Sequence, residues 1–249
     1  MERSCAEEKI VSGARRFFAP DVTAGEYALE GEEYNHAANV LRLKAGDEVV
    51  VSDGAGKDYS GTVERVEKKR MILRLAPGTE NPCKPKTEIT LAVGFLKGDK
   101  TELVVQKATE LGASRVVVFD SEFSSAFVSE NKLGRLTRVA EEAAKQCGRA
   151  EFPAVEYLPL AAALNAFSGV KNKIFACEFE EETPLDLSGL SGETVFFVGS
   201  EGGFSQKERE LALSLGYRSV TLGRRILRAE TAAISLLAVA AYRLGEWDR

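Results

Sequence analysis

The stretch from Phe196 to Ala212 reads FFVGSEGGFSQKERELA and decides the class of fold. It begins inside an apolar run, TVFFVG, whose lack of polar alternation is typical of a strand covered on both faces. SEGGF then makes the turn at the carboxyl end of that strand, and Ser205 with Glu208 predicts a capping box at the start of a helix. The glycines would let the backbone approach a ligand, but a tight turn without a ligand accounts for them equally well.

Strands and helices alternate on both sides of this turn. A further apolar run, YRSVTLG, predicts the strand that follows, and Asp99 with Glu102 predicts a second capping box. The other predicted segments are strands at 88–96, 115–120 and 172–178, and helices at 99–112, 132–146 and 160–167. This alternation favours an α/β layered domain with mostly parallel strands, which we place at residues 86–249.

The first third of the chain follows a different pattern. From Arg16 to Leu75, short alternating runs such as DEVVVSDG and DYSGTVERV are separated by Gly and Asp turns, as in a small β-barrel. The exception is EEYNHAANVLRL (32–43), in which apolar residues recur at helical spacing. The segment 76–86, APGTENPCKPK, has three prolines and is typical of a linker. We therefore predict a small barrel with one helix at residues 1–78.

Composition restricts the classes of protein. Of the 249 residues, 44% are hydrophobic and 29% are charged, as in soluble globular proteins. The net charge of −5 argues against a grip on nucleic acid by bulk positive charge, but it allows a local basic patch. The charged start MERSCAEEKI lacks the core of an export signal, so we expect a cytoplasmic protein. The apolar run 229–244 is too short for a membrane span, and the four scattered cysteines give no metal-binding pair.

Two loops carry the chemistry that the sequence suggests. The glycine loop lacks the spacing of dinucleotide folds and has no Gly-Lys-Ser/Thr, while Glu201 would repel a phosphate. A phosphate-poor or cationic ligand fits it better. The second loop follows Gly223 and reads RRILRAE, leading directly into an apolar helix. Arg228 in this loop needs an explanation, because it lies beside a helix that is about to be buried.

These two loops resemble a known family. FFVGSEGGFSQKE followed by VTLGRRILRAETAAISLLA is similar to the paired signature of the RsmE family of ribosomal RNA small subunit methyltransferases, in the SPOUT superfamily. RRFF, HAANVLRLKAGDEVVVSDG, KGDKTELVVQKATELGA and RVAEEAAKQCGRAEFP agree as well, in the same order along the chain. One departure is Ser200, which stands where much of the family has proline. Serine makes the turn less rigid, which bears on the affinity for the cofactor.

The resemblance implies a fold, a cofactor and a reaction. It implies a PUA-like β-barrel followed by a SPOUT α/β domain with a C-terminal trefoil knot. It further implies a homodimer that transfers a methyl group from S-adenosyl-L-methionine to N3 of a uridine in small-subunit (16S) ribosomal RNA. The carried-over cofactor-binding residues are Val198, Gly199, Glu201, Gly202, Leu222, Gly223, Ile226 and Leu227.

Methylation at N3 also needs a proton acceptor and a group that stabilises charge on the base oxygens. Arg228 is the candidate for the second role. Glu230 and Glu201 are the candidate acceptors, but a helix cap and a loop brace explain them equally well. Orientation and desolvation without a dedicated base are a further alternative.

Contact with RNA needs basic groups that reach phosphates. The family motifs indicate four such groups, which are Arg16, Arg42, Lys97 and Arg149. Phe17 and Phe18 would either stack on a base or belong to the core, and the single histidine, His36, is interpreted as structural. The final helix, apolar nearly all round, would be buried by a homodimer or within one chain.

Two other functions stay open at this point. A SPOUT enzyme could methylate another RNA atom, such as a ribose 2′-hydroxyl, although RILRAETA favours the RsmE type. The protein could also be a non-catalytic RNA-binding module that keeps an inactive α/β domain.

Overall fold

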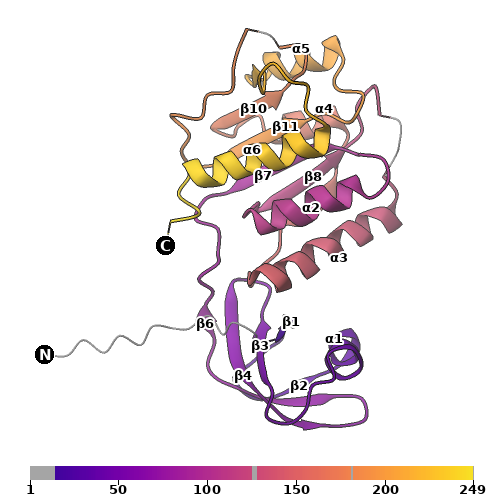
Figure 1. Ribbon diagram of the computed structural model, residues 1–249, viewed down its shortest axis with the longest axis vertical. Coiled ribbons are helices and arrows are strands. Elements are labelled where there is room, and N and C mark those ends of the chain that lie inside the picture. Colours follow the sequence, from indigo (N-terminus) through magenta and orange to yellow (C-terminus); the bar gives the residue numbers. More distant parts are fainter. Residues whose placement is uncertain (1–14, 125–127, 181, 249) are drawn as a thin grey trace, which may run out of the picture. The chain divides into compact units, whose positions relative to one another are not determined.

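The computed structural model describes residues 15–124, 128–180 and 182–248 (Figure 1). Within these ranges the chain forms two compact units. One runs as far as Cys83 and includes Gly148–Glu151, and the other contains Lys84–Cys147 and the residues from Phe152 onward. The division after Cys83 falls inside the proline-rich segment, between the predicted limits of 78 and 86. The return of 148–151 to the first unit was not indicated by the sequence.

The first unit is a strongly bent antiparallel sheet with one parallel pair. Its strand order is β1-β3-β4-β5-β2, with β6 paired to β4, and only β1 and β3 run parallel. The strands are β1 (Arg15–Phe18), β2 (Gly25–Leu29), β3 (Glu48–Ser52), β4 (Lys57–Val66), β5 (Met71–Leu75) and β6 (Thr79–Glu80). Alternate side chains of these strands, among them Val51 and Leu73, fill its core. Phe17 is fully buried there, so the core interpretation is correct for this residue.

The single helix of this unit is irregular. It consists of α1 (Gly31–Asn35) and a π-helical turn, η1 (His36–Val40). Ala37 is buried against the sheet, and the ring of His36 meets the ring of Phe17 edge-on with centroids 6.3 Å apart. This packing agrees with a structural role for the histidine. Arg42 follows the helix with a φ of 56°, a left-handed conformation that is uncommon for a non-glycine residue.

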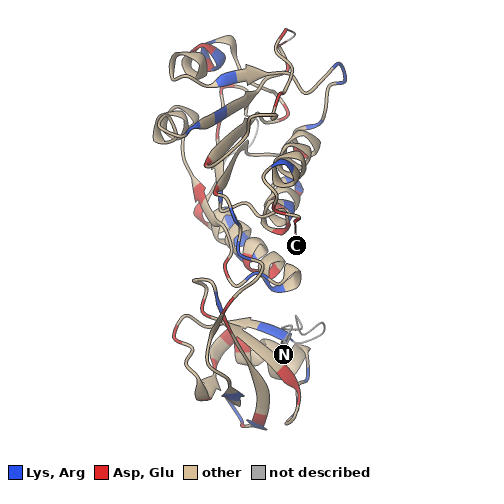
Figure 2. Ribbon diagram, turned by 90° about the vertical axis from the view of Figure 1, so that its left-hand side faces the viewer, with Lys and Arg blue, Asp and Glu red and all other residues tan. Residues whose placement is uncertain are grey.

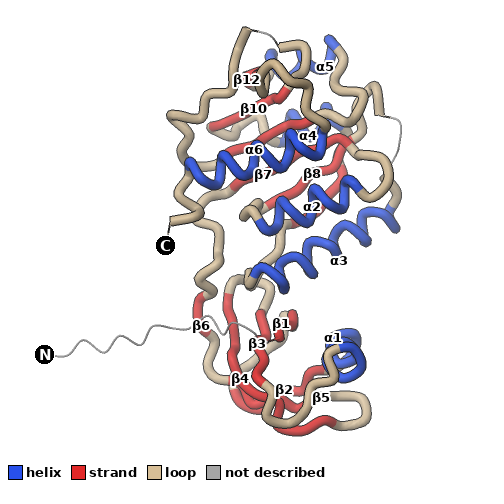
Figure 3. The backbone as a smooth tube through the Cα atoms, viewed as in Figure 1, coloured by secondary structure: helices blue, strands red, loops and turns tan. Residues whose placement is uncertain are grey.

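The second unit contains a six-stranded sheet, whose strands are red in Figure 3. Every strand pair in this sheet is parallel. The order is β12-β10-β11-β7-β8-β9. The strands are β7 (Ile89–Gly94), β8 (Arg115–Phe119), β9 (Ala154–Tyr157), β10 (Asn172–Ala176), β11 (Thr194–Val198) and β12 (Arg218–Val220). The prediction of a mostly parallel sheet is therefore confirmed. The sequence did not predict the edge strand β9, because this strand has only four residues and two of them, Glu156 and Tyr157, carry polar groups.

Helices cover both faces of this sheet, as the apolar strands require. They are α2 (Lys100–Glu110), α3 (Glu130–Cys147), α4 (Leu160–Ala166), α5 (Gln206–Ser214) and α6 (Ala229–Arg243). One core lies between the sheet and α2, α3 and α6, and the other lies between the sheet and α4 and α5. The domain is thus an α/β layered fold, and the trefoil knot stays a prediction.

The two predicted capping boxes have different outcomes. Ser205 accepts a hydrogen bond from the Glu208 N–H while Glu208 accepts one from the Ser205 N–H, which confirms the box at the start of α5. The box at α2 is wrong, because Asp99 makes no side-chain cap and Glu102 forms an ion pair with Arg135 at 2.9 Å instead. The Glu102 carboxylate thus binds the guanidinium of Arg135 on α3 and not the backbone N–H that the sequence pattern predicted.

The last helix is mostly buried inside its own unit. Residues such as Ala233 and Leu237 pack against β7, β11 and α2, while Val239 and Tyr242 remain exposed. None of the helices in the described part of the chain is long and apolar enough to cross a membrane. Within the same residues, no cluster of three or more metal-ligating side chains occurs, and Cys83 and Cys177 are free. Cys5 lies outside the described residues.

Candidate cofactor pocket and its charged rim

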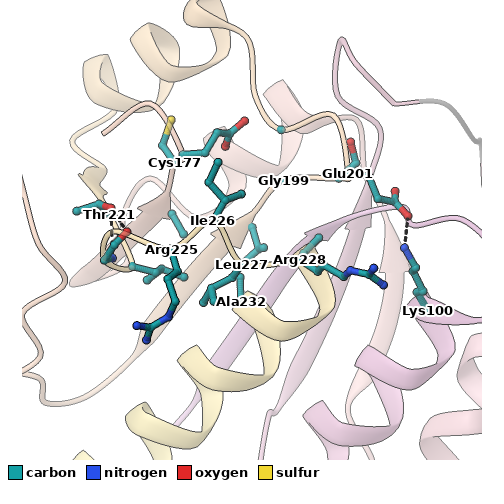
Figure 4. Close-up of a pocket in the computed structure, with 18 residues that line it drawn as sticks. Lys100, Cys177, Gly199, Glu201, Thr221, Arg225, Ile226, Leu227, Arg228 and Ala232 are labelled. Carbon is teal, nitrogen blue, oxygen red and sulfur yellow. Dashed lines mark hydrogen bonds and ion pairs between the residues drawn. The ribbon is translucent and has the colours of Figure 1, made fainter. Parts of the chain in front are cut away.

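A cavity of about 370 Å³ lies at the carboxyl end of the parallel sheet (Figure 4). It is formed where β10, β11 and β12 end, and the first turn of α6 closes one side. The strand order β12-β10-β11 explains the position, since it places β10 between the two strands whose loops the sequence singled out. The volume falls in the range of small-molecule sites.

The structure brings most of the predicted cofactor residues to this cavity. The lining includes seven of the eight, which are Val198, Gly199, Glu201, Leu222, Gly223, Ile226 and Leu227. Gly202 is absent from the lining, and a Cβ there would lie 2.7 Å from the Phe123 carbonyl oxygen. Gly202 therefore permits a backbone contact behind the loop, while Gly203 faces the cavity in its place.

The glycines of the loop are required by its tight backbone path. Gly203 has a φ of +69°, in the left-handed region, and its N–H donates to the Ser200 carbonyl oxygen at 3.0 Å. A Cβ on Gly94, at the end of β7, would lie 2.4 Å from the Ser200 nitrogen, so that glycine lets the loop pass over the neighbouring strand. The loop shape thus depends on glycine in two separate segments.

Lys100 and Glu201 line the cavity, and Glu230, which is not among the lining residues, lies against Lys100. The Lys100 Nζ, at the start of α2, lies 3.1 Å from a Glu201 carboxylate oxygen (Figure 4). The same Nζ lies 3.9 Å from a Glu230 oxygen. We call these three residues the rim cluster. All are partly buried, with side-chain exposures of 32%, 28% and 14% in that order.

Glu201 is firmly held within the rim cluster. Its Oε1 accepts hydrogen bonds from the Lys97 N–H and from Lys100 Nζ, both at 3.1 Å. Burial raises the pKa of Glu201, but these hydrogen bonds outweigh burial, so that the pKa lies below its ordinary value. Glu201 is therefore ionised near neutral pH, and its Oε1 already accepts two hydrogen bonds. These contacts agree with the interpretation that Glu201 braces the glycine loop.

Glu230 is less occupied than Glu201. The helix α6 begins after Arg228, and no side chain caps it, so Glu230 does not act as a cap. Within the described residues the Glu230 Oε2 is buried and has no hydrogen-bond partner. Among the residues that the structure describes, its other oxygen contacts only Lys100, at 3.9 Å. Glu230 therefore keeps a buried oxygen with acceptor capacity that the described residues do not use.

Arg228 lies at the N-terminal end of α6, with its side chain exposed and lining the cavity. It extends toward the side of the cavity where Lys100 and Glu201 lie, whereas Arg225 points away from them (Figure 4). Its guanidinium makes no hydrogen bond or ion pair with any residue that the structure describes. A forked donor of this kind is available to planar oxygen-bearing groups.

The four predicted RNA-binding residues have different environments. Arg42 and Lys97 are exposed. Arg16 is paired with Asp58 and also donates to Ser52, and Arg149 is buried, with 3% of its surface exposed. Lysines and arginines alternate with acidic residues over both units (Figure 2). The role of all four in RNA binding stays a prediction.

Sequence reasoning missed several residues of the cavity. The end of β10 contributes a complete wall, made of Ala176, Cys177 and Glu178, and Lys100 joins from α2. Nothing in NKIFACE indicated a site, because the segment carries neither a glycine turn nor a cluster of charge. Only the strand order, with β10 between β11 and β12, could have revealed this wall.

Comparisons with known proteins agree with this geometry. A family model described as an RNA methyltransferase domain matches residues 82–241, and one described as an RNA methyltransferase PUA domain matches residues 29–76. Fold and cavity together therefore define an RNA methyltransferase of two units.

Several curated relatives carry the same name. The chain is 34% identical over 227 residues to the ribosomal RNA small subunit methyltransferase E of Mesomycoplasma hyopneumoniae, covering 89% of this chain and 96% of that protein. It is 33% identical to the protein of that name from Rickettsia conorii, covering 82% and 84%. The chain belongs to the RsmE family of ribosomal RNA small subunit methyltransferases.

Solved structures show the same architecture. The ribosomal RNA small subunit methyltransferase E of Neisseria gonorrhoeae, bound to S-adenosyl methionine, has a TM-score of 0.83 and 27% identity, covering 93% of this chain and 98% of that one. A Legionella pneumophila structure with the bound cofactor has a TM-score of 0.81 and 27% identity, covering 92% and 97%. S-adenosylmethionine is accordingly the cofactor of this type of protein.

Proposed function

We propose that this protein transfers the methyl group of S-adenosylmethionine to N3 of a uridine in small-subunit ribosomal RNA. The observation that carries the proposal is the cavity at the ends of β10, β11 and β12, with a rim cluster of one lysine and two glutamates. The family to which the chain belongs supports the reaction class. The particular atom and base follow from the RsmE-type loop RILRAETA.

The residues of the cavity fit this cofactor. Leu222, Ile226, Leu227 and Ala232 offer an apolar surface to a flat base, and the glycine loop offers backbone groups without a lysine. The rim cluster carries one net negative charge, which suits a sulfonium. The bound cofactor would supply an electrophilic methyl group. We assign its binding to the eight predicted residues, with Gly202 acting through the loop shape.

The chain's own residues would supply the remaining chemistry. Glu230 would accept the N3 proton, because it has free acceptor capacity close to the cavity. Arg228 would donate to a carbonyl oxygen of the base and stabilise the negative charge that develops as the proton leaves. Glu201 would hold the glycine loop against the Lys97 backbone and keep its negative charge near the cofactor.

The partners follow from the surface of each unit. Arg42 and Lys97 are the exposed candidates for phosphate contacts, and Arg16 would have to exchange Asp58 for a phosphate to join them. Arg149 is buried, so it would have to become accessible to contact a phosphate. We further propose a cytoplasmic homodimer in which Val239 and Tyr242 of α6 are covered by the second copy.

The test uses labelled S-adenosylmethionine and small ribosomal subunits that lack the modification. After incubation the RNA is digested and the labelled nucleoside is identified. Labelled 3-methyluridine supports the proposal. A ribose-methylated nucleoside would show that the same site acts on another atom, and binding of RNA without label in any nucleoside would leave a non-catalytic binding protein.

A further inference from the structure

Glu178 is a carboxylate of the cofactor cavity to which the proposed reaction gives no role. It lies two residues after the end of β10, and it is one of the residues that line the cavity. Within the described part of the chain, its carboxylate forms no hydrogen bond or ion pair. A polar group of this kind, placed in a small-molecule cavity, is available to a donor on the ligand.

The glycine loop fixes the place of this carboxylate. A Cβ on Gly203 would lie 2.5 Å from the carboxylate carbon of Glu178, which is closer than real Cβ atoms approach a neighbour. Gly203 therefore has two reasons to be glycine, since its φ of +69° also disfavours a side chain. The missing side chain lets the Glu178 carboxylate lie directly against the loop that follows β11.

The other charged groups that line the cavity do not neutralise Glu178. Lys100 and Glu201 form an ion pair with each other at 3.1 Å. Arg225 and Arg228 also line the cavity, and neither forms an ion pair with Glu178. The cavity thus contains a paired carboxylate at its rim and a second carboxylate, on the β10 wall, whose acceptor oxygens the described residues do not use.

The strand order places Glu178 between the two ends of the proposed ligand. Along the carboxyl edge of the sheet the strands follow in the order β12, β10, β11 and β7. Leu222, after β12, belongs to the apolar surface for the adenine, while Glu201, after β11, and Lys100, after β7, mark the sulfonium end. Neighbouring strands are about 4.8 Å apart, so the end of β10 lies one such step from each side. In S-adenosylmethionine the ribose joins the adenine to the sulfur, and β10 is therefore the strand that faces the ribose.

We propose that Glu178 binds the ribose of the cofactor by accepting hydrogen bonds from its 2′- and 3′-hydroxyl groups. The proposal rests on the function given above and adds a cofactor-binding residue to it. A carboxylate has two acceptor oxygens, which suit two adjacent hydroxyl donors. Dinucleotide-binding folds use the same chemistry, because an acidic residue there accepts a hydrogen bond from a ribose hydroxyl.

Three ligands separate the parts of the cofactor that Glu178 could contact. S-adenosylhomocysteine has the ribose hydroxyls and the amino-acid part. 5′-Methylthioadenosine keeps the hydroxyls and lacks the amino-acid part, and the 2′,3′-dideoxy analogue of S-adenosylhomocysteine lacks the hydroxyls. All three contain a neutral thioether, so an attraction between Glu178 and a sulfonium does not enter the comparison.

Calorimetry measures the affinity of the purified full chain and of Glu178→Gln for each ligand. Glu178→Gln should bind S-adenosylhomocysteine and 5′-methylthioadenosine about tenfold more weakly, because a neutral amide oxygen is a weaker acceptor than a carboxylate. The dideoxy analogue should bind the wild type about tenfold more weakly than S-adenosylhomocysteine does, and the substitution should weaken it no further. Glu193→Gln, an exposed glutamate just before β11 and outside the cavity, is the matched control and should equal the wild type.

Three results would overturn the assignment of Glu178. The first is an unchanged affinity of Glu178→Gln for S-adenosylhomocysteine. The second is a loss for S-adenosylhomocysteine but not for 5′-methylthioadenosine, which would mean that Glu178 contacts the ammonium group of the amino-acid part. The third is an equal loss for all three ligands, which would mean that Glu178 only shapes the loop.

Failure of the proposed function gives different results. A wild-type chain that binds none of the three ligands would overturn both the function and the ribose contact. A wild-type chain that binds them with the predicted dependence on Glu178, but forms no labelled 3-methyluridine in ribosomal subunits, would overturn the function and support the contact. Equal thermal midpoints of Glu178→Gln and the wild type show that a change in affinity arises from the site and not from misfolding.

Discussion

Two of the clusters of carboxylates and cations in the second unit differ in how completely their groups are satisfied. Glu180 pairs with Arg209 at 2.6 Å and also accepts hydrogen bonds from the N–H groups of Glu182 and Thr183. In the rim cluster, by contrast, one lysine serves two carboxylates, and a buried Glu230 oxygen has no partner within the described ranges. We call the Glu180–Arg209 cluster closed, because its carboxylate has a cation and backbone donors as partners. We call the rim cluster open, because it keeps an acceptor that no described residue uses.

The difference separates a structural ion pair from a site. The hydrogen bond from Arg209 lowers the pKa of Glu180 to about 2, against the opposing effect of burial, so this carboxylate is ionised and has little remaining capacity to bind a ligand. The open cluster borders a cavity and keeps acceptor capacity that the protein alone does not use. Unsatisfied polar groups beside a cavity are the better guide to chemistry than charge by itself.

The largest effect is expected for Arg228→Ala. If this guanidinium stabilises charge on the base oxygens, its removal should lower kcat by about 10³-fold while the affinity for S-adenosylmethionine changes little. Single-turnover methylation and calorimetry measure the two quantities. Arg224→Ala, an exposed arginine outside the cavity, is the matched control. Equal rates for Arg228→Ala and the wild type would remove Arg228 from the mechanism.

The second prediction contrasts the two clusters directly. Glu230→Gln should lower kcat by about 10²-fold, because an amide cannot accept the N3 proton, and it should leave the thermal midpoint nearly unchanged. Glu180→Gln, the same substitution in the closed cluster, should lower the thermal midpoint and leave kcat of the folded enzyme unchanged. The reverse pattern would contradict our assignment of the open and closed clusters.

The third prediction concerns stability. Arg209→Ala leaves the Glu180 carboxylate without its cation and should cost about 2–3 kcal/mol of unfolding free energy at pH 7. Because the folded-state pKa of Glu180 is depressed, its contribution is present above the ordinary value of 4.5 and is lost as pH falls toward about 2. Urea unfolding from pH 7 to pH 3 should therefore show the variant and the wild type converging. A constant difference would contradict the ion-pair account.

The smallest effect is expected at Ser200, at the position where the resemblance to the RsmE family implies proline in many members. The buried Ser200 hydroxyl has no hydrogen-bond partner among the described residues, so its loss carries no penalty. Ser200→Pro should tighten S-adenosylmethionine binding about two- to threefold, because the proline ring restricts the conformations of the glycine loop before the ligand binds. Ser200→Ala separates the effect of the ring from the loss of the hydroxyl. Weaker binding by the proline variant would mean that the loop needs the freedom that serine gives.

The layered fold was predictable because the apolar strands and the Ser205–Glu208 box are local patterns. The failures have physical causes. Strand β9 is short and half-polar, and Glu102 forms an ion pair across to α3, a contact that no local pattern contains. The π-helical turn at His36–Val40 likewise follows from tertiary packing against the barrel sheet.

The site was predictable only where its residues lie in the two loops. Both loops carry glycines or arginines that local chemistry marks as unusual, and the structure brings them to one cavity. The wall from β10 and the partnership of Lys100 depend on strand order and on contacts over 100 residues apart. Such contacts are set by the whole fold, so one sequence without its structure does not reveal them.

The most direct test of the account is a crystal structure of the protein with S-adenosylhomocysteine. We predict that the ligand occupies the cavity at the ends of β10, β11 and β12, with its adenine against Leu222 and Leu227 and its sulfur facing the rim cluster. Density for the ligand outside this cavity, or a sulfur that points away from Lys100, Glu201 and Glu230, would contradict it.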